Sequence, residues 1–240
     1  GGNIGAEMAA KSPADGYTIL FAYSGTHSVN RSIYSSMPFQ ESDFAPIIWT
    51  AAVPQILVVH PSLPVKNVKE LIALAKSRPN QLVYGSTGSG AINHLAGELF
   101  KMMTGIDIVH VPYRGNPRPD LIGGQVQLMF ATSGSIAPHV KSGRLRALAV
   151  TSLEPSALAP GLPTMAASGL PGYESIGLTG VLAVGDKVPR PAIARLNAEI
   201  KKILLTPEIS KKIVELGGEV RTDTPDEFGA WIAKAIAEWG

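Results

Sequence analysis

Short apolar runs alternate with amphipathic stretches along most of the chain. Residues 56–59 are all apolar and lie between two prolines, a pattern typical of a buried strand. Apolar residues spaced as on one helix face follow at 68–75, and a second stripe of this kind covers 92–103. Strands that alternate with helices predict an α/β fold in which helices cover parallel sheets. The predicted strands are 17–23, 56–59, 81–84, 107–111, 126–130, 145–151 and 176–184, with a short helix at 136–141.

The pattern changes after 176–184, because only helical periodicity follows. Helices are predicted at 191–204 and 207–216, and a third begins after Thr224. Thr224 is followed by a proline at the first helical position and by Glu227 at the third, the arrangement of a capping box. Near the start of the chain, Asn3 is predicted to cap a helix that extends to residue 11.

Composition excludes several classes of protein. The 240 residues carry a formal net charge of +2 without a basic run, which argues against a nucleic-acid-binding or membrane-surface protein. A hydrophobic content of 45% excludes a disordered chain, and the apolar stretch 47–59 is too short and too interrupted to span a bilayer. The absence of cysteine excludes disulfides, thiolate metal sites and a cysteine nucleophile. The size fits one large domain or two compact lobes.

The strongest local signal is the loop 85–90, which reads Gly-Ser-Thr-Gly-Ser-Gly between a predicted strand and a predicted helix. Small residues let the backbone approach a ligand, and free N–H groups at a helix start, beside hydroxyls, favour an anion. The loop is not a P-loop, since no Gly-Lys-Ser/Thr follows. It is not a dinucleotide fingerprint either, since Asn93 stands where the third glycine belongs. A tight strand-to-helix turn without a ligand uses the same residues, so both interpretations stay open at this point.

Three more polar loops follow predicted strands, at 24–28, 113–115 and 132–135. Ligands of open α/β sheets bind beyond the carboxyl ends of the strands, where such loops lie. Arg114 adds a guanidinium that can bind a carboxylate through two hydrogen bonds. Taken singly, each loop is compatible with a polar surface turn and Arg114 with an exposed side chain, but together they favour an anion-binding site.

No catalytic constellation stands out. No serine lies in Gly-x-Ser-x-Gly, the five histidines lack the spacing of a metal site, and the carboxylates form no obvious acid–base pair. His94, near the start of its helix, is predicted to be a structural or ligand-bonding residue, and His110 a core residue within a strand. The sequence therefore predicts a binding site without a reactive group.

Short motifs in a fixed order connect these loops to a known family. They are Gly-Gly-Asn-Ile-Gly-Ala (1–6), Asp-Gly-Tyr-Thr (15–18), Ser-Gly-Thr-His (24–27), Asp-Phe-Ala-Pro (43–46), Val-His-Pro-Ser (59–62), the loop 85–90 with His94, His-Val-Pro-Tyr-Arg-Gly (110–115), Gly-Gly-Gln-Val (123–126), Gly-Arg-Leu-Arg-Ala-Leu-Ala-Val-Thr (143–151), Gly-Leu-Pro-Gly-Tyr-Glu (169–174) and Ala-Arg-Leu-Asn (194–197). Over nearly its whole length the chain resembles the Bug-type (TctC-like) substrate-binding proteins of tripartite tricarboxylate transporters.

The resemblance implies a two-lobed periplasmic-binding-protein fold of type II, a Venus flytrap with sheets flanked by helices. Lobe 1 is expected to comprise 1–60 and 178–240, preceded by a further strand and a ligand-contacting loop, and lobe 2 to comprise 61–177. Such proteins are exported to the periplasm, close on a small carboxylate (a dicarboxylate or an aromatic acid) and deliver it to a membrane permease. We therefore expect a monomer with no catalysis, cofactor, metal, nucleic-acid partner or membrane insertion.

The resemblance also places ligand contacts on the loops already described. From lobe 1 it implies Ser24, Gly25 and Thr26, and from lobe 2 Ser86, Thr87, Ser89, His94, Tyr113, Arg114, Gly115 and Thr132. Ala131 stands where many members have an aspartate associated with amino-group ligands, which favours a plain carboxylate over an amino acid. Two alternatives remain: a ligand-sensing effector domain of a regulator, and an enzyme on the same scaffold.

Overall fold

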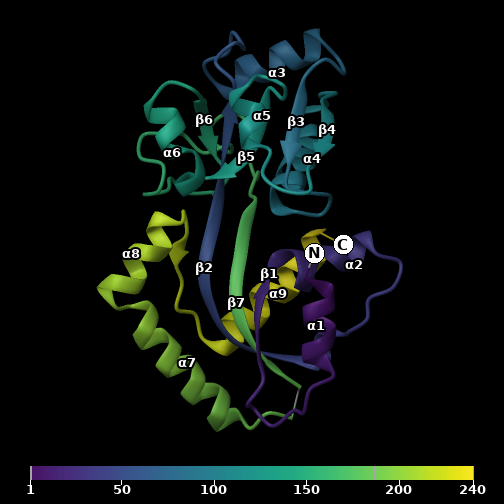
Figure 1. The fold of residues 1–240 in the computed structure, drawn as a ribbon, viewed down its shortest axis with the longest axis vertical. Helices are drawn as coiled ribbons and strands as arrows, with labels where there is room; N and C mark the ends of the chain where they lie inside the picture. Colours follow the sequence, from purple (N-terminus) through teal and green to yellow (C-terminus); the bar gives the residue numbers. More distant parts are fainter. Residues whose placement is uncertain (1, 186, 240) are drawn as a thin grey trace. The chain divides into compact units, whose positions relative to one another are not determined.

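The computed structural model describes residues 2–185 and 187–239 (Figure 1). Contacts divide the chain into two compact units: unit 1 is Gly1–Val53, Gly177–Val214 and Glu219–Gly240, and unit 2 is Pro54–Ile176 and Glu215–Gly218. Two of these divisions fall inside long strands, β2 (Phe44–Val59) and β7 (Ile176–Val184). The functional lobes 1–60 with 178–240 and 61–177 stay a prediction. By contacts, the end of β2 belongs to unit 2, because it pairs with strands of that unit.

Unit 2 is a mixed sheet with helices packed on it (Figure 1). Its elements besides the end of β2 are β3 (Val83–Ser86), β4 (Val109–Pro112), β5 (Leu128–Thr132), β6 (Arg146–Val150), α3 (Val68–Ser77), α4 (Ile92–Thr104), α5 (Arg118–Ile122) and α6 (Ser133–Lys141). β3 pairs in parallel with β4 and β5, whereas β2 pairs antiparallel with β5 and β6. The prediction of parallel sheets is therefore correct only for β3, β4 and β5. Helical crossovers connect β3 to β4 and β4 to β5 and permit their parallel direction, whereas β2 runs opposite to β5 and β6.

The apolar run 56–59 is explained by a sheet that is buried on both faces. Leu57 and Val59 belong to one hydrophobic cluster, together with Tyr84. Ile56 and Val58 belong to a second cluster. Successive side chains of a strand point to opposite faces, so a strand covered on both sides needs apolar residues at every position.

Unit 1 contains a smaller antiparallel sheet. Its elements are α1 (Asn3–Ala10), β1 (Ile19–Tyr23), η1 (Gly25–Val29), α2 (Asn30–Ile33), η2 (Glu41–Asp43), most of β2 and β7, α7 (Arg190–Leu204), α8 (Pro207–Glu215, whose last residue is assigned to unit 2), β8 (Glu219–Val220) and α9 (Pro225–Trp239). β7 lies between β1 and β2, with β1 antiparallel to it, and β8 pairs antiparallel with β2. The predicted strand 176–184 matches β7.

Several predicted features of unit 1 are wrong. β2 begins at Phe44, well before the predicted 56–59, because its polar residues are satisfied within the sheet: the Thr50 hydroxyl donates to the Thr179 carbonyl over 2.9 Å. The expected loop 24–28 is a helical turn, η1, that continues into α2. Asn3 does not cap α1; Gly2 holds that position, and the Asn3 side chain accepts a hydrogen bond from Asn30 over 2.6 Å. The short elements α2, α5, β8 and η2 carry no periodic signal and were not predicted.

The capping box of α9 is confirmed. The Thr224 backbone N–H donates to the Glu227 carboxylate over 2.8 Å, and the Glu227 N–H donates to the Thr224 hydroxyl over 3.3 Å. We expect Thr224→Ala to lower the free energy of unfolding by about 1 kcal/mol, since the first turn of α9 loses this partner. Urea denaturation measures the change. Thr224→Ser retains the hydroxyl and should regain most of the loss; equal losses in both variants would contradict a capping role.

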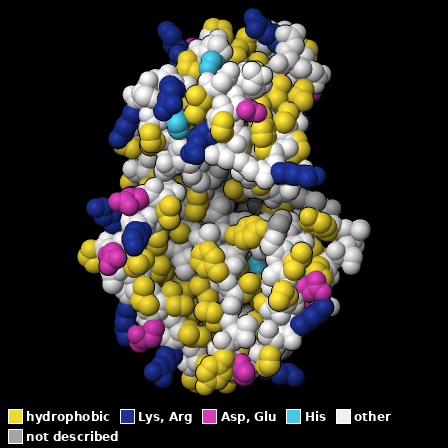
Figure 2. All heavy atoms as spheres, viewed as in Figure 1, with side chains coloured by type: hydrophobic (Ala, Val, Ile, Leu, Met, Phe, Trp, Pro, Cys, Tyr) yellow, Lys and Arg dark blue, Asp and Glu magenta, His cyan; other side chains and the backbone are white. Residues whose placement is uncertain are grey.

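Two observations concern membrane insertion and the distribution of charge on the surface. None of the described helices combines the length and apolar composition needed to cross a bilayer. On the face shown in Figure 2, the Lys and Arg side chains are dispersed among Asp and Glu and form no continuous basic patch.

Candidate ligand-binding site

Three of the predicted loops of unit 2 lie at one edge of its sheet. Ser86 is the last residue of β3, Tyr113 follows β4, and Thr132 ends β5. These three strands are parallel neighbours, so their carboxyl ends point to the same edge. In α/β sheets this edge is where ligands bind. The structure therefore brings the predicted residues of unit 2 together.

The hydroxyl of Ser86 is used inside the loop. Ser86 is fully buried, and its Oγ lies 2.6 Å from Nε2 of His110 on the neighbouring strand β4. The same Oγ accepts a hydrogen bond from the Gly88 N–H over 3.2 Å. Gly88 and Gly90 have φ angles of 134° and 77°, which side chains disfavour, so the glycines allow the turn that Ser86 holds.

Side chains also occupy backbone donors that were expected to be free at the start of α4. Thr87 donates to Asn93 Oδ1 over 3.2 Å from both its N–H and its hydroxyl. The Gly90 N–H donates to His94 Nδ1 over 3.1 Å. The expectation of free N–H groups is thus wrong for Thr87, Gly88 and Gly90. Asn93 was missed as a site residue, although its place in the first turn of the helix after a glycine-rich loop was the available signal.

Three stacked aromatic rings pack beside the glycine-rich loop 85–90. The His110 ring stacks on Tyr84 and on His94, with centroids 4.8 Å and 4.1 Å apart. Burial, together with the neighbouring His94, lowers the pKa of His110 to about 4, and burial lowers the pKa of His94 as well. His94 is therefore neutral at pH 7, as its role as acceptor for the Gly90 N–H requires.

The loop after β4 is tied to the glycine-rich loop. The Tyr113 N–H donates to the Ser86 carbonyl over 2.9 Å, and the Tyr113 hydroxyl donates to Asp120 of α5 over 2.6 Å. This hydrogen bond, with a smaller effect of burial, raises the pKa of Tyr113 to about 12. Arg114 and Gly115 are exposed. Tyr113 thus fixes the loop, and the guanidinium beside it faces solvent.

Thr132 is half-buried and holds the N-cap position of α6 without a side-chain cap bond. Its carbonyl accepts a hydrogen bond from the Ser135 hydroxyl over 2.8 Å. Arg118 of α5 donates to the Ser135 carbonyl over 2.5 Å and so joins the start of α6 to α5. Thr87 and Ser89, by contrast, are exposed.

The predicted residues of unit 1 lie together on η1, and their hydroxyls are used internally. Ser24 is buried and its Oγ accepts a hydrogen bond from the Leu178 N–H of β7 over 2.7 Å. Thr26 is buried and donates to the Tyr23 carbonyl over 3.0 Å. A side chain at Gly25 would come within 2.7 Å of the Tyr23 ring, which explains the glycine. These contacts dock η1 on the sheet of unit 1.

A mixed α/β chain of two compact units, with polar loops at the carboxyl ends of parallel strands, matches the periplasmic-binding-protein fold expected from the sequence. Solved structures of that fold are similar over almost the whole chain. R. palustris Rpa4515 with adipate is 37% identical with a TM-score of 0.88, covering 99% of this chain and 80% of that protein. The periplasmic binding protein BugD is 31% identical with a TM-score of 0.84, covering 100% of this chain and 81% of BugD. The predicted fold class is confirmed.

The sequence model of the tripartite tricarboxylate transporter family receptor matches residues 1–240, and the chain belongs to this family. Among its relatives, the UPF0065 protein in the tcbD-tcbE intergenic region of Pseudomonas sp. (strain P51) is 35% identical over 100% of this chain and 72% of that protein. BugT of Bordetella pertussis (strain Tohama I) is 34% identical over 100% of this chain and 74% of BugT. The family consists of periplasmic solute-binding receptors that are not enzymes, which confirms the predicted class.

Proposed function

We propose that this receptor captures a small carboxylate, a dicarboxylate or an aromatic acid, in the periplasm and delivers it to the membrane permease of a tripartite tricarboxylate transporter. The family assignment supports the transport role. The presence of adipate, a dicarboxylate, in the 37% identical Rpa4515 supports the ligand class.

The observation that carries the proposal is the exposed guanidinium of Arg114 beside a rigid loop of hydroxyls. No ion pair or hydrogen bond is found for this guanidinium among the described residues. Arginine can bind a carboxylate through two parallel hydrogen bonds. Such charge-assisted bonds are roughly twice as strong as hydrogen bonds between neutral groups. The exposed Ser89 comes from the neighbouring loop at the same edge.

The site residues divide into two groups in this proposal. Arg114, Gly115 and Ser89 contact the carboxylate, since they are exposed. Ser86, Thr87, His94 and Tyr113 act chiefly as positioning residues, because they use their polar side-chain atoms within the protein. Thr132 is placed with them because it is half-buried. Ser24, Gly25 and Thr26 remain a prediction of the family resemblance, and the proposal rests on unit 2 alone.

Calorimetric titration with adipate, citrate, benzoate and glutamate tests the ligand class. Arg114→Met removes the charge at similar length, and we expect it to weaken the best carboxylate by about 10- to 100-fold, the value of a charge-assisted hydrogen bond. Arg144→Met is the matched control, because Arg144 is an exposed arginine of the same unit outside the three loops. Unchanged affinity in Arg114→Met, or tight binding of glutamate alone, would contradict the proposal.

A further inference from the structure

Two histidine rings of unit 2 lie against each other beside the glycine-rich loop 85–90. His94 belongs to the first turn of α4 and His110 to β4, and their ring centroids are 4.1 Å apart. Both residues are half-buried, so protons from the solvent can reach the rings. The pair therefore combines two titratable groups with a loop of the carboxylate site.

Each ring holds one end of this loop through a ring nitrogen. Nε2 of His110 lies 2.6 Å from the Ser86 hydroxyl, near the start of the loop. Nδ1 of His94 accepts a hydrogen bond from the backbone N–H of Gly90, the last residue of the loop, over 3.1 Å. The conformation of the loop thus depends on the hydrogen-bonding state of both rings.

The two hydrogen bonds respond differently to a proton. A protonated histidine carries N–H groups on both nitrogens and accepts at neither. The bond from Gly90 to His94 is therefore lost on protonation, because two donors then face each other. The Ser86 hydroxyl, by contrast, can accept from a protonated His110 and donate to the Gly88 carbonyl, which lies 3.2 Å away. His94 is the proton-sensitive member of the pair.

The charged groups around the pair leave a proton on His94 without a free counter-charge. Burial lowers the pKa of His94 most, the Glu98 carboxylate raises it and Lys101 lowers it, both from α4. Glu98 is already engaged, because it accepts a hydrogen bond from Tyr84 of β3 over 2.5 Å and pairs with Lys101 over 3.0 Å. On β4, burial and the neighbouring His94 lower the pKa of His110 to about 4. In mild acid His110 therefore stays neutral and the proton goes to His94.

We propose that the stacked pair of His94 and His110 holds the loop 85–90 in its binding form only while His94 is neutral, so that a proton on His94 frees Gly90 and weakens carboxylate binding. This regulation rests on the proposed function, since it acts on the same site. Only the neutral fraction of His94 is competent to bind, so the affinity falls by up to about tenfold for each pH unit below its pKa. Binding in mild acid then expels a proton, whereas a histidinium that touched the carboxylate directly would take one up.

Calorimetric titration of the full chain with adipate, citrate and benzoate at pH 7 and pH 5 tests the proposal. His94→Asn keeps an acceptor oxygen at the position of Nδ1 that takes up no proton, and His94→Phe keeps a ring without an acceptor. We expect the wild type to lose at least about threefold in affinity at pH 5 relative to His94→Asn, since protonation of the acids themselves is common to both. His94→Phe should bind more weakly than His94→Asn at pH 7.

His60→Asn is the matched control. Nδ1 of His60 also accepts a backbone N–H, that of Ser62, over 3.2 Å. His60 follows Val59, which pairs with the first residue of β5, so it lies at the edge of the sheet remote from Thr132. This variant should keep the acid response of the wild type. An equal loss of affinity in the wild type and His94→Asn overturns the proposal, and so does proton uptake on binding, measured in two buffers of different ionisation heat.

NMR of the protein without added acid separates this proposal from the proposed function. Between pH 7 and pH 5 the Gly90 amide resonance should titrate together with the His94 ring in the wild type and stay in place in His94→Asn. If none of the three acids binds at pH 7, the proposed function fails, and the coupled titration still decides whether His94 holds the loop. A Gly90 resonance that does not follow His94 overturns the proposal.

Discussion

Gly97→Ala is expected to lower the free energy of unfolding by about 3 kcal/mol, although alanine is the better helix former by roughly 1 kcal/mol. Gly97 is buried in α4, and a Cβ there would lie 2.3 Å from Cε2 of the Tyr84 ring. That ring is fully buried, donates a hydrogen bond to Glu98 and stacks on His110. It cannot move away without disturbing the bond between His110 and Ser86, so the variant should also weaken carboxylate binding.

Gly5→Ala is the matched control, because Gly5 lies in α1 with open space where a Cβ would be added. Here only the helix propensity acts, and stability should rise by up to about 1 kcal/mol. Urea denaturation of the two variants gives changes of opposite sign if the Tyr84 ring sets the cost. A stabilised Gly97→Ala protein would show that α4 packs less closely on β3 than described.

Local signals in the sequence were sufficient for most helices and for the buried strands. The strand 176–184 and the capping box at Thr224 both follow from neighbouring residues, and both are confirmed. β2 was largely missed because its prolines and polar residues break the apolar pattern, and only distant partners such as Thr179 make those positions compatible with a strand. Antiparallel pairing of β2 depends equally on distant contacts.

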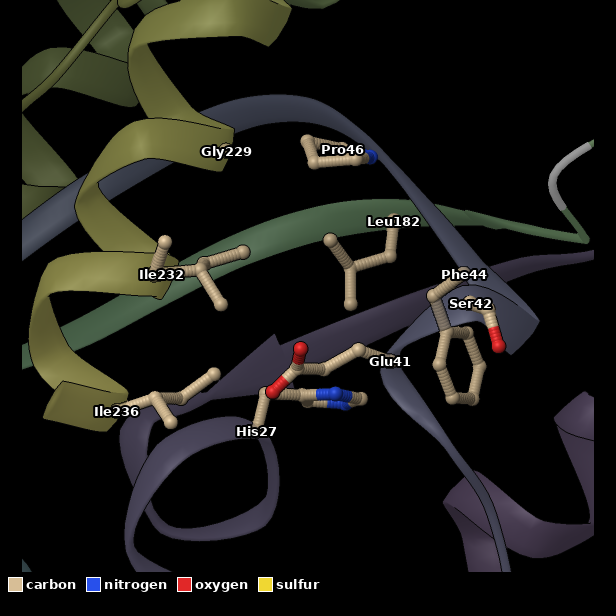
Figure 3. A pocket seen from close by; sticks show the side chains of 10 residues that line it. His27, Glu41, Ser42, Phe44, Pro46, Leu182, Gly229, Ile232 and Ile236 are labelled. Atoms are coloured by element: carbon tan, nitrogen blue, oxygen red, sulfur yellow. The ribbon is translucent and has the colours of Figure 1, made fainter. Parts of the chain in front are cut away.

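The site could be predicted as a group of loops but not as a set of available donors. The glycine-rich loop is visible in the sequence, yet its amides are occupied by Ser86, Asn93 and His94 through turn geometry that the sequence does not specify. The Ser24 hydroxyl is occupied by the Leu178 N–H, far away in the chain. The pocket of about 260 Å³ in unit 1 (Figure 3) had no signal in the sequence, because its wall combines segments near residues 27, 44, 182 and 232.

Acid should destabilise the protein through His27, by about 3 kcal/mol between pH 7 and pH 4. The ordinary pKa of 6.5 applies to the unfolded chain, and burial lowers the folded value to about 4. As pH falls below 6.5 the unfolded state takes up a proton that the folded state refuses, so unfolding becomes more favourable until about pH 4, where both states are protonated. A difference from 6.5 to about 4 corresponds to roughly 3 kcal/mol. His110, which is half-buried, acts in the same direction with a smaller effect.

Urea denaturation at several pH values isolates this contribution when the wild type is compared with His27→Phe. Carboxylates change their protonation in both proteins, so the difference between the two curves reports His27, and His27→Phe should lose about 3 kcal/mol less on acidification. Phe228→Leu serves as the control, because it weakens the core of unit 1 without removing a titratable group. It should lower stability equally at every pH. Parallel curves for the wild type and His27→Phe would mean that His27 takes up its proton at the same pH in the folded and the unfolded chain, and its buried charged ring would then need a partner that balances the charge.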